Sequence, residues 1–291
     1  MSGASPPDDG AWLSGALSET RLADEFRRIE AAFEPARNPS TPFDPKMHAP
    51  EVVEKARAWW LAVMRTEYES ESTFVEMAIQ LRAINEPQDV QAVTLRMAQD
   101  ELRHAAIAAR VVSALGGEAR IRPSPARRAA AHADCAPTES ALRSIIFGCC
   151  LSETVNAARL TKGYGETTDP FIKEAFRLLL TDERLHAQFG FYFLENKRTW
   201  LDAHPEVRRN LARYLRFAFA SLERYMGAVP VGAQPLTDAE RAIGLPDLTE
   251  LSRTFQETVV NACIPGLENF GIDAAQAWRE RGIDPPPKDA P

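Results

Sequence analysis

The stretches "DELRHA" (residues 100–105) and "DERLHA" (residues 182–187) repeat one pattern of acidic residues and histidine. In both, a glutamate precedes a histidine by three residues, a spacing that places the two side chains on one face of an α-helix. Glu101 and His104 can therefore reach a common point, and so can Glu183 and His186. The chain has only five histidines, so two such copies are hard to attribute to chance. The repeat predicts two helices that each supply a carboxylate and an imidazole to a transition metal.

Helical spacing of apolar residues extends through most of the chain, and clusters of proline and glycine interrupt it. We predict four long helices at about residues 49–84, 90–115, 138–162 and 169–201, with shorter ones at 19–33 and 205–226 and one or two within 247–281. No strand pattern is convincing, so the predicted fold is all-α. Two helical hairpins joined by a long crossover are typical of a ferritin-like four-helix bundle. The expected organisation is an N-terminal extension (1–48), the bundle (49–201) and C-terminal accessory helices (202–291).

A dinuclear site in such a bundle needs one more carboxylate from each of the other two helices. Residues at one height in an antiparallel hairpin are equally far from its turn. The midpoint between Glu71 and Glu101 is residue 86, and that between Glu153 and Glu183 is residue 168; each lies in a predicted turn. Both pairs are 30 residues apart, which selects Glu71 and Glu153 as ligands. Glu67, one turn from Glu71, is the alternative on the first helix.

Electrostatics supports a metal site over an ordinary polar surface. Four carboxylates gathered in an apolar core would be very unfavourable without cations. Two divalent metals carry a charge that balances four carboxylates and two neutral imidazoles. Asp100 and Asp182 are each expected to accept a hydrogen bond from the histidine of the opposite hairpin, because metal-bound histidines usually donate their other N–H. The competing interpretation, surface salt bridges on solvated helices, fits the apolar flanks of these residues less well.

Composition and charge narrow the class of protein. A formal net charge of −7 and the lack of a basic stripe argue against a nucleic-acid partner. No apolar stretch is long enough to cross a membrane, and the first residues do not resemble a signal peptide. The four cysteines form no Cys-x-x-Cys pair and are expected to be reduced thiols in a cytoplasmic protein.

The pattern of Glu71, Glu101, His104, Glu153, Glu183 and His186 resembles the ligand set of the ferritin-like diiron-carboxylate superfamily. The resemblance implies a non-haem centre of two irons, with manganese–iron as an alternative, that reacts with O2. Ferritins end soon after the bundle, rubrerythrins add a Cys-x-x-Cys module and radical subunits place a tyrosine where Ala108 stands, so the chain departs from all three. The small diiron oxygenases are the nearest analogy.

The resulting hypothesis is an O2-dependent oxidase or oxygenase that acts on a small or medium organic substrate through a bridging peroxide. An external electron donor, a ferredoxin or a reductase, is expected as a partner. The C-terminal helices would cover the bundle or form a homodimer contact. The alternatives are a ferroxidase or iron-handling protein without an organic substrate, and a metal-free helical scaffold. The expected substrate pocket comprises Phe74, Ala105, Ala108, Cys149, Asn156 and Ala157.

Overall fold

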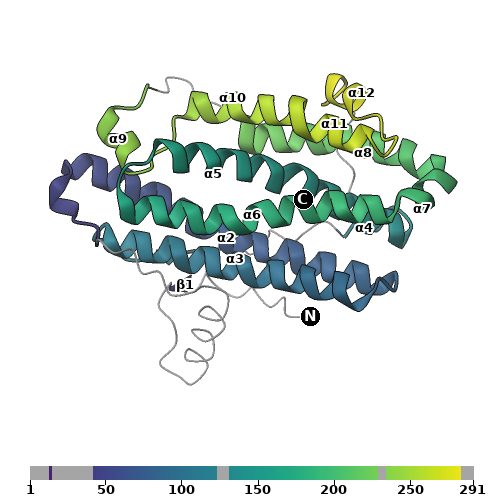
Figure 1. Ribbon diagram of the computed structural model, residues 1–291, viewed down its shortest axis with the longest axis horizontal. Coiled ribbons are helices and arrows are strands. Elements are labelled where there is room, and N and C mark those ends of the chain that lie inside the picture. Colours follow the sequence, from purple (N-terminus) through teal and green to yellow (C-terminus); the bar gives the residue numbers. More distant parts are fainter. Residues whose placement is uncertain (1–12, 15–41, 123–130, 229–233, 283–291) are drawn as a thin grey trace, which may run out of the picture.

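Four long helical segments form the bundle of the computed structural model, which describes residues 13–14, 42–122, 131–228 and 234–282 (Figure 1). They are α2 (Pro50–Ala83), α3 (Gln88–Ala114), α6 (Pro170–Asn196) and one continuous helix made of α4 (Pro137–Ile145), a π-helical segment (Ile146–Glu153) and α5 (Thr154–Glu166). Helix α2 packs along α3, and α5 packs along α6. Contacts of α3 with α6 and of α2 with α4 close the bundle. The predicted all-α, ferritin-like fold is confirmed.

Local sequence sets the turns of both hairpins. Asn85 adopts a left-handed backbone conformation (φ 57°) between α2 and α3, which asparagine tolerates better than most residues. At the start of α6, the Asp169 side chain accepts a hydrogen bond from the Ile172 N–H (3.0 Å), and Pro170 occupies the first helical position. Gly116 ends α3 with φ 74°. These signals keep the two helices of each hairpin in a defined register.

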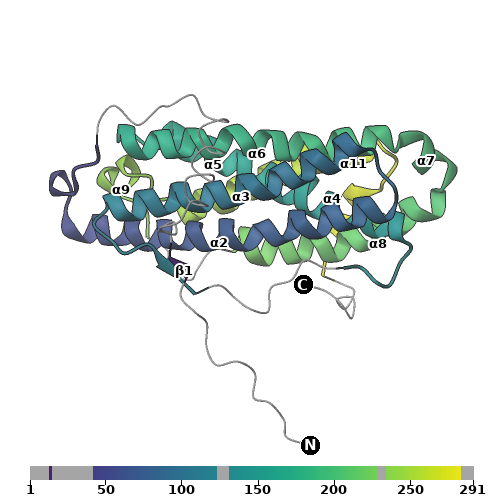
Figure 2. The ribbon, with the colours of Figure 1, turned by 90° about the horizontal axis from the view of Figure 1, so that it is seen from below.

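The C-terminal part of the chain forms a second layer on one side of the bundle (Figures 1 and 2). Helix α10 lies along α5, α8 contacts α4 and α12, and α9 contacts α2. The elements are α7 (Arg198–Ala203), α8 (Pro205–Leu222), a π-helical segment (Glu223–Gly227), α9 (Asp238–Ala242), α10 (Leu248–Thr258), a second π-helical segment (Val259–Cys263), α11 (Ile264–Glu268) and α12 (Ala274–Arg279). These C-terminal helices contact α2, α4 and α5 of the bundle. The predicted helix at 19–33 lies outside the described residues.

Two short features complete the described structure. Strand β1 (Leu13–Ser14) pairs antiparallel with β2 (Arg120–Ile121), a contact that the sequence did not predict. A 3₁₀ turn (Pro45–Met47) precedes α2, capped by the Asp44 side chain. Within the described ranges, every helix is too short or too polar to cross a lipid bilayer.

The apolar core is divided into two clusters, and the polar site lies between them. On α2, Trp60 and Met64 belong to one cluster, and Phe74 and Met77 belong to the other. Helix α6 shows the same order, because residues near Leu179 join the first cluster and residues near Phe193 join the second. The intervening turns of both helices carry buried acidic and histidine side chains. Apolar packing above and below therefore holds the polar layer in place and keeps water from it.

Candidate metal centre

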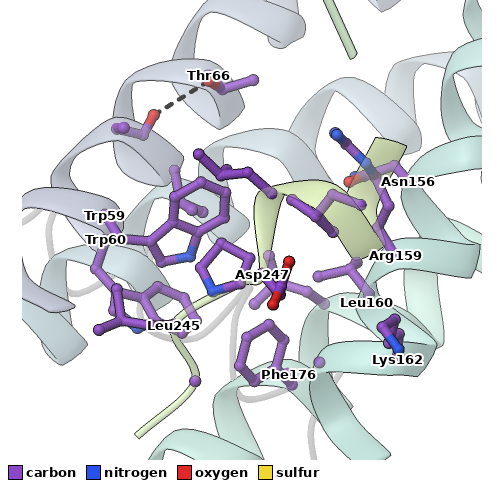
Figure 3. Close-up of a pocket in the computed structure, with 18 of the residues that line it drawn as sticks. Trp59, Trp60, Thr66, Asn156, Arg159, Leu160, Lys162, Phe176, Leu245 and Asp247 are labelled. Carbon is purple, nitrogen blue, oxygen red and sulfur yellow. Dashed lines mark hydrogen bonds between the residues drawn. The ribbon is translucent and has the colours of Figure 1, made fainter. Parts of the chain in front are cut away.

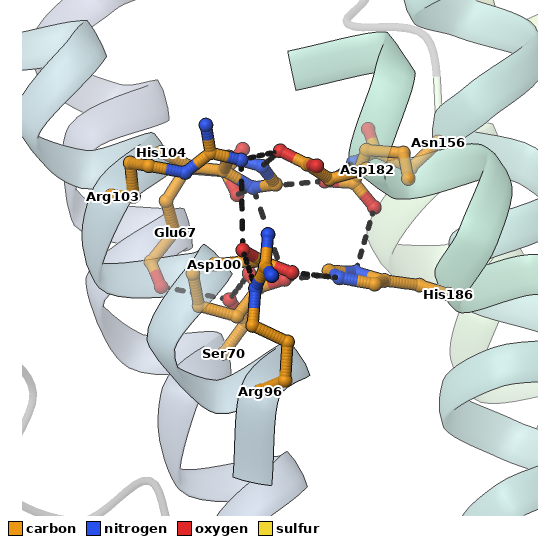
Figure 4. Close-up of polar contacts among 11 residues, drawn as sticks. Glu67, Ser70, Arg96, Asp100, Arg103, His104, Asn156, Asp182 and His186 are labelled. Carbon is orange, nitrogen blue, oxygen red and sulfur yellow. Dashed lines mark hydrogen bonds and ion pairs between the residues drawn. The ribbon is translucent and has the colours of Figure 1, made fainter. Parts of the chain in front are cut away.

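Six buried acidic and histidine side chains from four helical segments converge in the polar layer of the bundle. Figure 4 shows most of the surrounding contacts, with the side chains of α2 and α3 facing those of α6. The six residues are Glu67, Glu101, His104, Glu153, Glu183 and His186.

These residues form two overlapping groups that share Glu101 and Glu183. In one group, the two shared carboxylates lie with Glu67 and His104, and one ligand atom from each residue falls within 4.8 Å of the others. In the second group they lie with Glu153 and His186, at the same limit. Two ions placed in these groups would be bridged by the shared carboxylates. This is the arrangement expected of a dinuclear carboxylate centre.

The two imidazoles present equivalent nitrogens to the centre. His104 Nδ1 lies 3.4 Å from Glu183 Oε1 and 3.5 Å from Glu67 Oε2, and His186 Nδ1 lies 3.2 Å from Glu101 Oε1. Both Nδ1 atoms are buried without a hydrogen-bond partner in the described part of the chain, as are Glu101 Oε1 and Glu183 Oε2. Buried polar atoms are seldom left unsatisfied, and metal ligation would satisfy all four. The donor set therefore fits a pair of divalent transition metals.

The outer nitrogens of both histidines face aspartates of the opposite hairpin, as the sequence predicts. His104 Nε2 lies 3.1 Å from Asp182 Oδ2, and His186 Nε2 lies 3.5 Å from Asp100 Oδ2 (Figure 4). An N–H that donates to carboxylate at Nε2 leaves the Nδ1 lone pair directed toward the centre. The two aspartates thus select the tautomer that a metal ligand requires.

Two arginines neutralise these aspartates, and sequence reasoning did not find either one. Arg103 forms an ion pair with Asp182 and lies 3.5 Å from Asp100 Oδ1, so that a single guanidinium links the partners of both histidines. The Arg96 Nε–H donates to Asp100 Oδ1 at 2.7 Å. Because both aspartates have arginine partners, the inner carboxylates depend on other cations for charge balance. Arg103 occupies a position in "DELRHA" whose counterpart in "DERLHA" is the exposed Leu185, so the repeat gave no signal for it.

The pKa values of the carboxylates and histidines in the cluster are shifted, because these groups are buried together without enough positive charge. Burial, with smaller contributions from nearby Glu101 and Glu183 and against the opposing effect of His104, raises the pKa of Glu67 to about 8. Burial and the neighbouring Glu183 raise the pKa of Glu153 well above its usual range. Burial alone would lower the pKa of His104, but Asp182, Glu183 and Glu67 raise it well above 6.5. Without metal, the cluster therefore holds protons at neutral pH in place of cations.

Neighbouring groups hold the shared carboxylates. The Ser70 hydroxyl donates to Glu101 Oε2, and Asn156 Nδ2 donates to Glu183 Oε1 at 3.1 Å. Glu153 is the last residue of the π-helical segment, a local insertion that is frequent at functional sites. Helix α6 passes very close to this segment, because a Cβ added at Gly190 would lie 2.7 Å from Cys149 Cβ and Cys150 Sγ. Glycine at this position lets α6 approach the helix that carries Glu153.

Glu67 takes the place on α2 that the sequence analysis assigned to Glu71. Glu71 is half-buried and belongs to neither group, so the assignment of Glu71 is corrected to the alternative, Glu67. Glu67 lies as far before the end of α2 at Ala83 as His104 lies after the start of α3 at Gln88. The register of the hairpin therefore allows two pairings. Glu67 can lie at the height of His104, and Glu71 can lie at the height of Glu101. The rotation of α2 about its axis decides between them.

A cavity of about 320 Å³ reaches the centre at Glu67 and Asn156 (Figure 3). It lies between α2, α5, α6 and the C-terminal layer, and its apolar lining includes Trp59, Trp60 and Phe176. Of the predicted pocket residues, Asn156 lines this cavity. Phe74 packs its ring against His186, with 5.2 Å between ring centroids, and Cys149 and Ala108 are enclosed in the core. The other five predicted pocket residues, which include Ala105 and Ala157, do not line this cavity, which lies against the C-terminal helices.

The helical bundle and the buried carboxylate–histidine cluster define this part of the chain as a ferritin-like bundle with a candidate diiron centre. Comparison with protein-family models gives a match to Rubrerythrin over residues 62–189, less than half of the chain but a range that contains all six residues of the cluster. This segment belongs to the ferritin-like diiron-carboxylate superfamily. The matched range covers most of the four-helix bundle. Comparison with curated proteins and with solved structures gave no match.

Proposed function

We propose that this protein is an O2-dependent diiron oxidase or oxygenase that acts on a small or medium organic substrate. The observation that carries the proposal is the cavity beside the cluster, bordered by Glu67 of the candidate metal centre and by Asn156. A protein that only oxidises or stores iron has no need of an apolar chamber at its metals. Ligand cavities in proteins are concave, mostly apolar and supplied with a few polar groups, and this cavity has those properties.

Two irons bound by Glu67, Glu101, His104, Glu153, Glu183 and His186 would supply the reduction of O2. The protein's own groups would have three tasks. Asp100 and Asp182 hold the protons on the outer nitrogens of the histidines, which keeps the inner nitrogens available as ligands. Ser70 and Asn156 fix the orientation of the shared carboxylates. The aromatic wall of the cavity excludes water from the reacting groups, which strengthens the electrostatic interactions there. An external donor would deliver the electrons.

Iron stoichiometry and the effect of filling the cavity test this proposal together. Val63 lines the cavity one helical turn from Glu67, so Val63→Trp should fill the space next to the centre. Val93→Trp, at an exposed position on α3, is the matched control. We expect aerobic Fe(II) titration to load about two irons per chain in the wild-type protein and both variants. A panel of small aromatic and branched organic compounds should stimulate O2 consumption in the wild type and Val93→Trp, but not in Val63→Trp.

The iron-handling alternative makes the opposite predictions. Uptake of many irons per chain, with O2 consumption that is independent of organic compounds and unchanged by Val63→Trp, would favour a ferroxidase. Protein from iron-fed cells that contains less than about one metal per chain, with Glu101→Ala unchanged in stability, would leave only a helical scaffold. Either result would remove the proposed oxygenase.

A further inference from the structure

Arg159 is a partly buried cation in the wall of the cavity (Figure 3). Its Nη2–H donates to the Met226 carbonyl at 2.7 Å, and its Nε is buried without a hydrogen-bond partner in the described part of the chain. Burial lowers the pKa of Arg159 to about 10, partly opposed by Tyr225, so the guanidinium stays charged at neutral pH. The cavity therefore contains a positive charge with unused donor capacity.

The other cations that line the cavity already have acidic partners. Lys162 Nζ lies 2.9 Å from a Glu166 carboxylate oxygen and 3.1 Å from one of Glu250. Arg241 lies 3.9 Å from Asp247 Oδ2 and also donates to the Leu236 carbonyl at 3.3 Å. Among the described residues, no carboxylate forms an ion pair with Arg159, and none contributes to its pKa.

The acidic residues that share the cavity are engaged elsewhere. Asp247 Oδ1 accepts from the backbone N–H groups of Thr249 and Glu250 at the start of α10, and Glu67 belongs to the metal centre. A desolvated charge without a counter-charge is costly, and an incoming anion would remove that cost. A guanidinium suits a carboxylate in particular, because its planar fork can donate two parallel hydrogen bonds.

The position of Arg159 sets the orientation of a bound molecule. Arg159 follows Asn156 by three residues on α5, which is about 4.5 Å along the helix axis, and Asn156 contacts Glu183 of the centre. A volume of about 320 Å³ is at the small end of the range of ligand cavities. The apolar side chains of Trp60, Leu160 and Phe176 face the remaining space.

We propose that the cavity selects a small organic acid, with its carboxylate on Arg159 and its apolar body directed toward Glu67 and Asn156. Identifying this acid as the substrate rests on the proposed oxygenase function; its binding does not. Arg159 would be the residue that determines substrate class. The acid would be short, since only about one helical turn separates the anchor from the metal centre.

Calorimetric titration of iron-loaded protein without O2 tests the proposal. The probes are benzoate, phenylacetate and 3-methylbutanoate, each compared with its neutral amide. The proteins are the wild type, Arg159→Met and the matched control Lys162→Met, which removes a cation of the same helix and cavity that is already paired. Hydrogen bonds to a charged group correspond to a factor of about ten to a hundred in affinity. We expect the wild type to bind at least one acid tighter than its amide by that factor.

The acid preference should disappear in Arg159→Met and persist in Lys162→Met. A preference that survives Arg159→Met would place the carboxylate on the metals and overturn the proposal, as would a wild type that prefers no acid to its amide. If Arg159→Met does not fold, Arg159→Gln replaces it, because glutamine keeps a donor for the Met226 carbonyl. The affinities for each acid and its amide are then compared in Arg159→Gln in the same way. Acid binding without acid-stimulated O2 consumption would leave this inference intact and count against the proposed function. O2 consumption that only neutral compounds stimulate would support the proposed function and count against this inference.

Discussion

Replacing Glu67 with glutamine tests which carboxylate of α2 belongs to the centre, and Glu71→Gln provides the matched control one helical turn away. In the metal-free protein, burial raises the pKa of Glu67 from 4.5 to about 8, so the folded protein binds a proton there at neutral pH that the unfolded chain releases. Because the pKa of Glu67 is higher in the folded state, protonation of Glu67 stabilises the fold. This contribution is complete at pH values below the unfolded-state pKa of 4.5. That contribution is lost as the pH rises through about 8.

The expected magnitude follows from the difference between the two pKa values. At about 1.4 kcal/mol for each pKa unit, the Glu67 carboxyl should lower the free energy of unfolding by about 3 kcal/mol between pH 5 and pH 8. Relaxation of the site and entry of water make this value an upper limit. Glutamine imitates the protonated carboxyl and does not titrate. Glu67→Gln should therefore become more stable relative to the wild type as the pH rises, by a few kcal/mol across this range.

Urea unfolding of metal-free protein at several pH values between 5 and 8 measures the effect. Glu71→Gln should show a smaller change with pH than Glu67→Gln, because burial also raises the pKa of Glu71 but Glu71 is only half-buried and lies outside the cluster. Metal analysis adds an independent result, since Glu67→Gln should load fewer metals than the wild type and Glu71→Gln the same number. Parallel pH curves for Glu67→Gln and the wild type, or a larger effect from Glu71→Gln, would refute the assignment of Glu67.

Three further predictions concern the surroundings of the centre. Metal affinity should rise with pH between about 6 and 8, because His104 and His186 have raised pKa values and must lose protons to bind metal. A competition titration measures this affinity, and an affinity that does not change with pH would contradict the prediction. Arg103→Met should destabilise the protein by about 3–5 kcal/mol in urea, because it leaves two buried aspartates without a shared cation, and a loss below about 1 kcal/mol would argue against the network. Gly190→Ala should cost about 1–3 kcal/mol by overpacking, whereas Gly165→Ala, which meets open space, should cost nothing; equal thermal unfolding of the two variants would refute the close approach.

Local periodicity explains why much of the site could be predicted. The spacing of Glu101 and His104, and of Glu183 and His186, specifies two side chains on one helical face wherever those helices lie. Two residues that are equally far from the turn of a helical hairpin lie at the same height. This rule placed Glu153 opposite Glu183 without any knowledge of packing. The pairing of each histidine with an aspartate of the opposite hairpin followed from the needs of a metal ligand.

The exact carboxylate on α2 required the tertiary structure. Glu67 and Glu71 both lie at heights that match a ligand on α3, and they differ by only about 40° around the helix. Which one faces inward depends on how Trp60, Met64 and Phe74 pack, and these contacts come from distant parts of the chain.

By itself, the sequence determined the helical order, the two histidines of the cluster, three of its four carboxylates and the aspartates behind the histidines. All of these depend on spacing within one helix or one hairpin. Only the tertiary structure decided the choice of Glu67, the arginine between the aspartates and the cavity with Arg159 in its wall. The cavity exists because residues 225–228 and 241–251 lie against α2 and α5, and contacts between segments so far apart leave no periodic trace in the sequence.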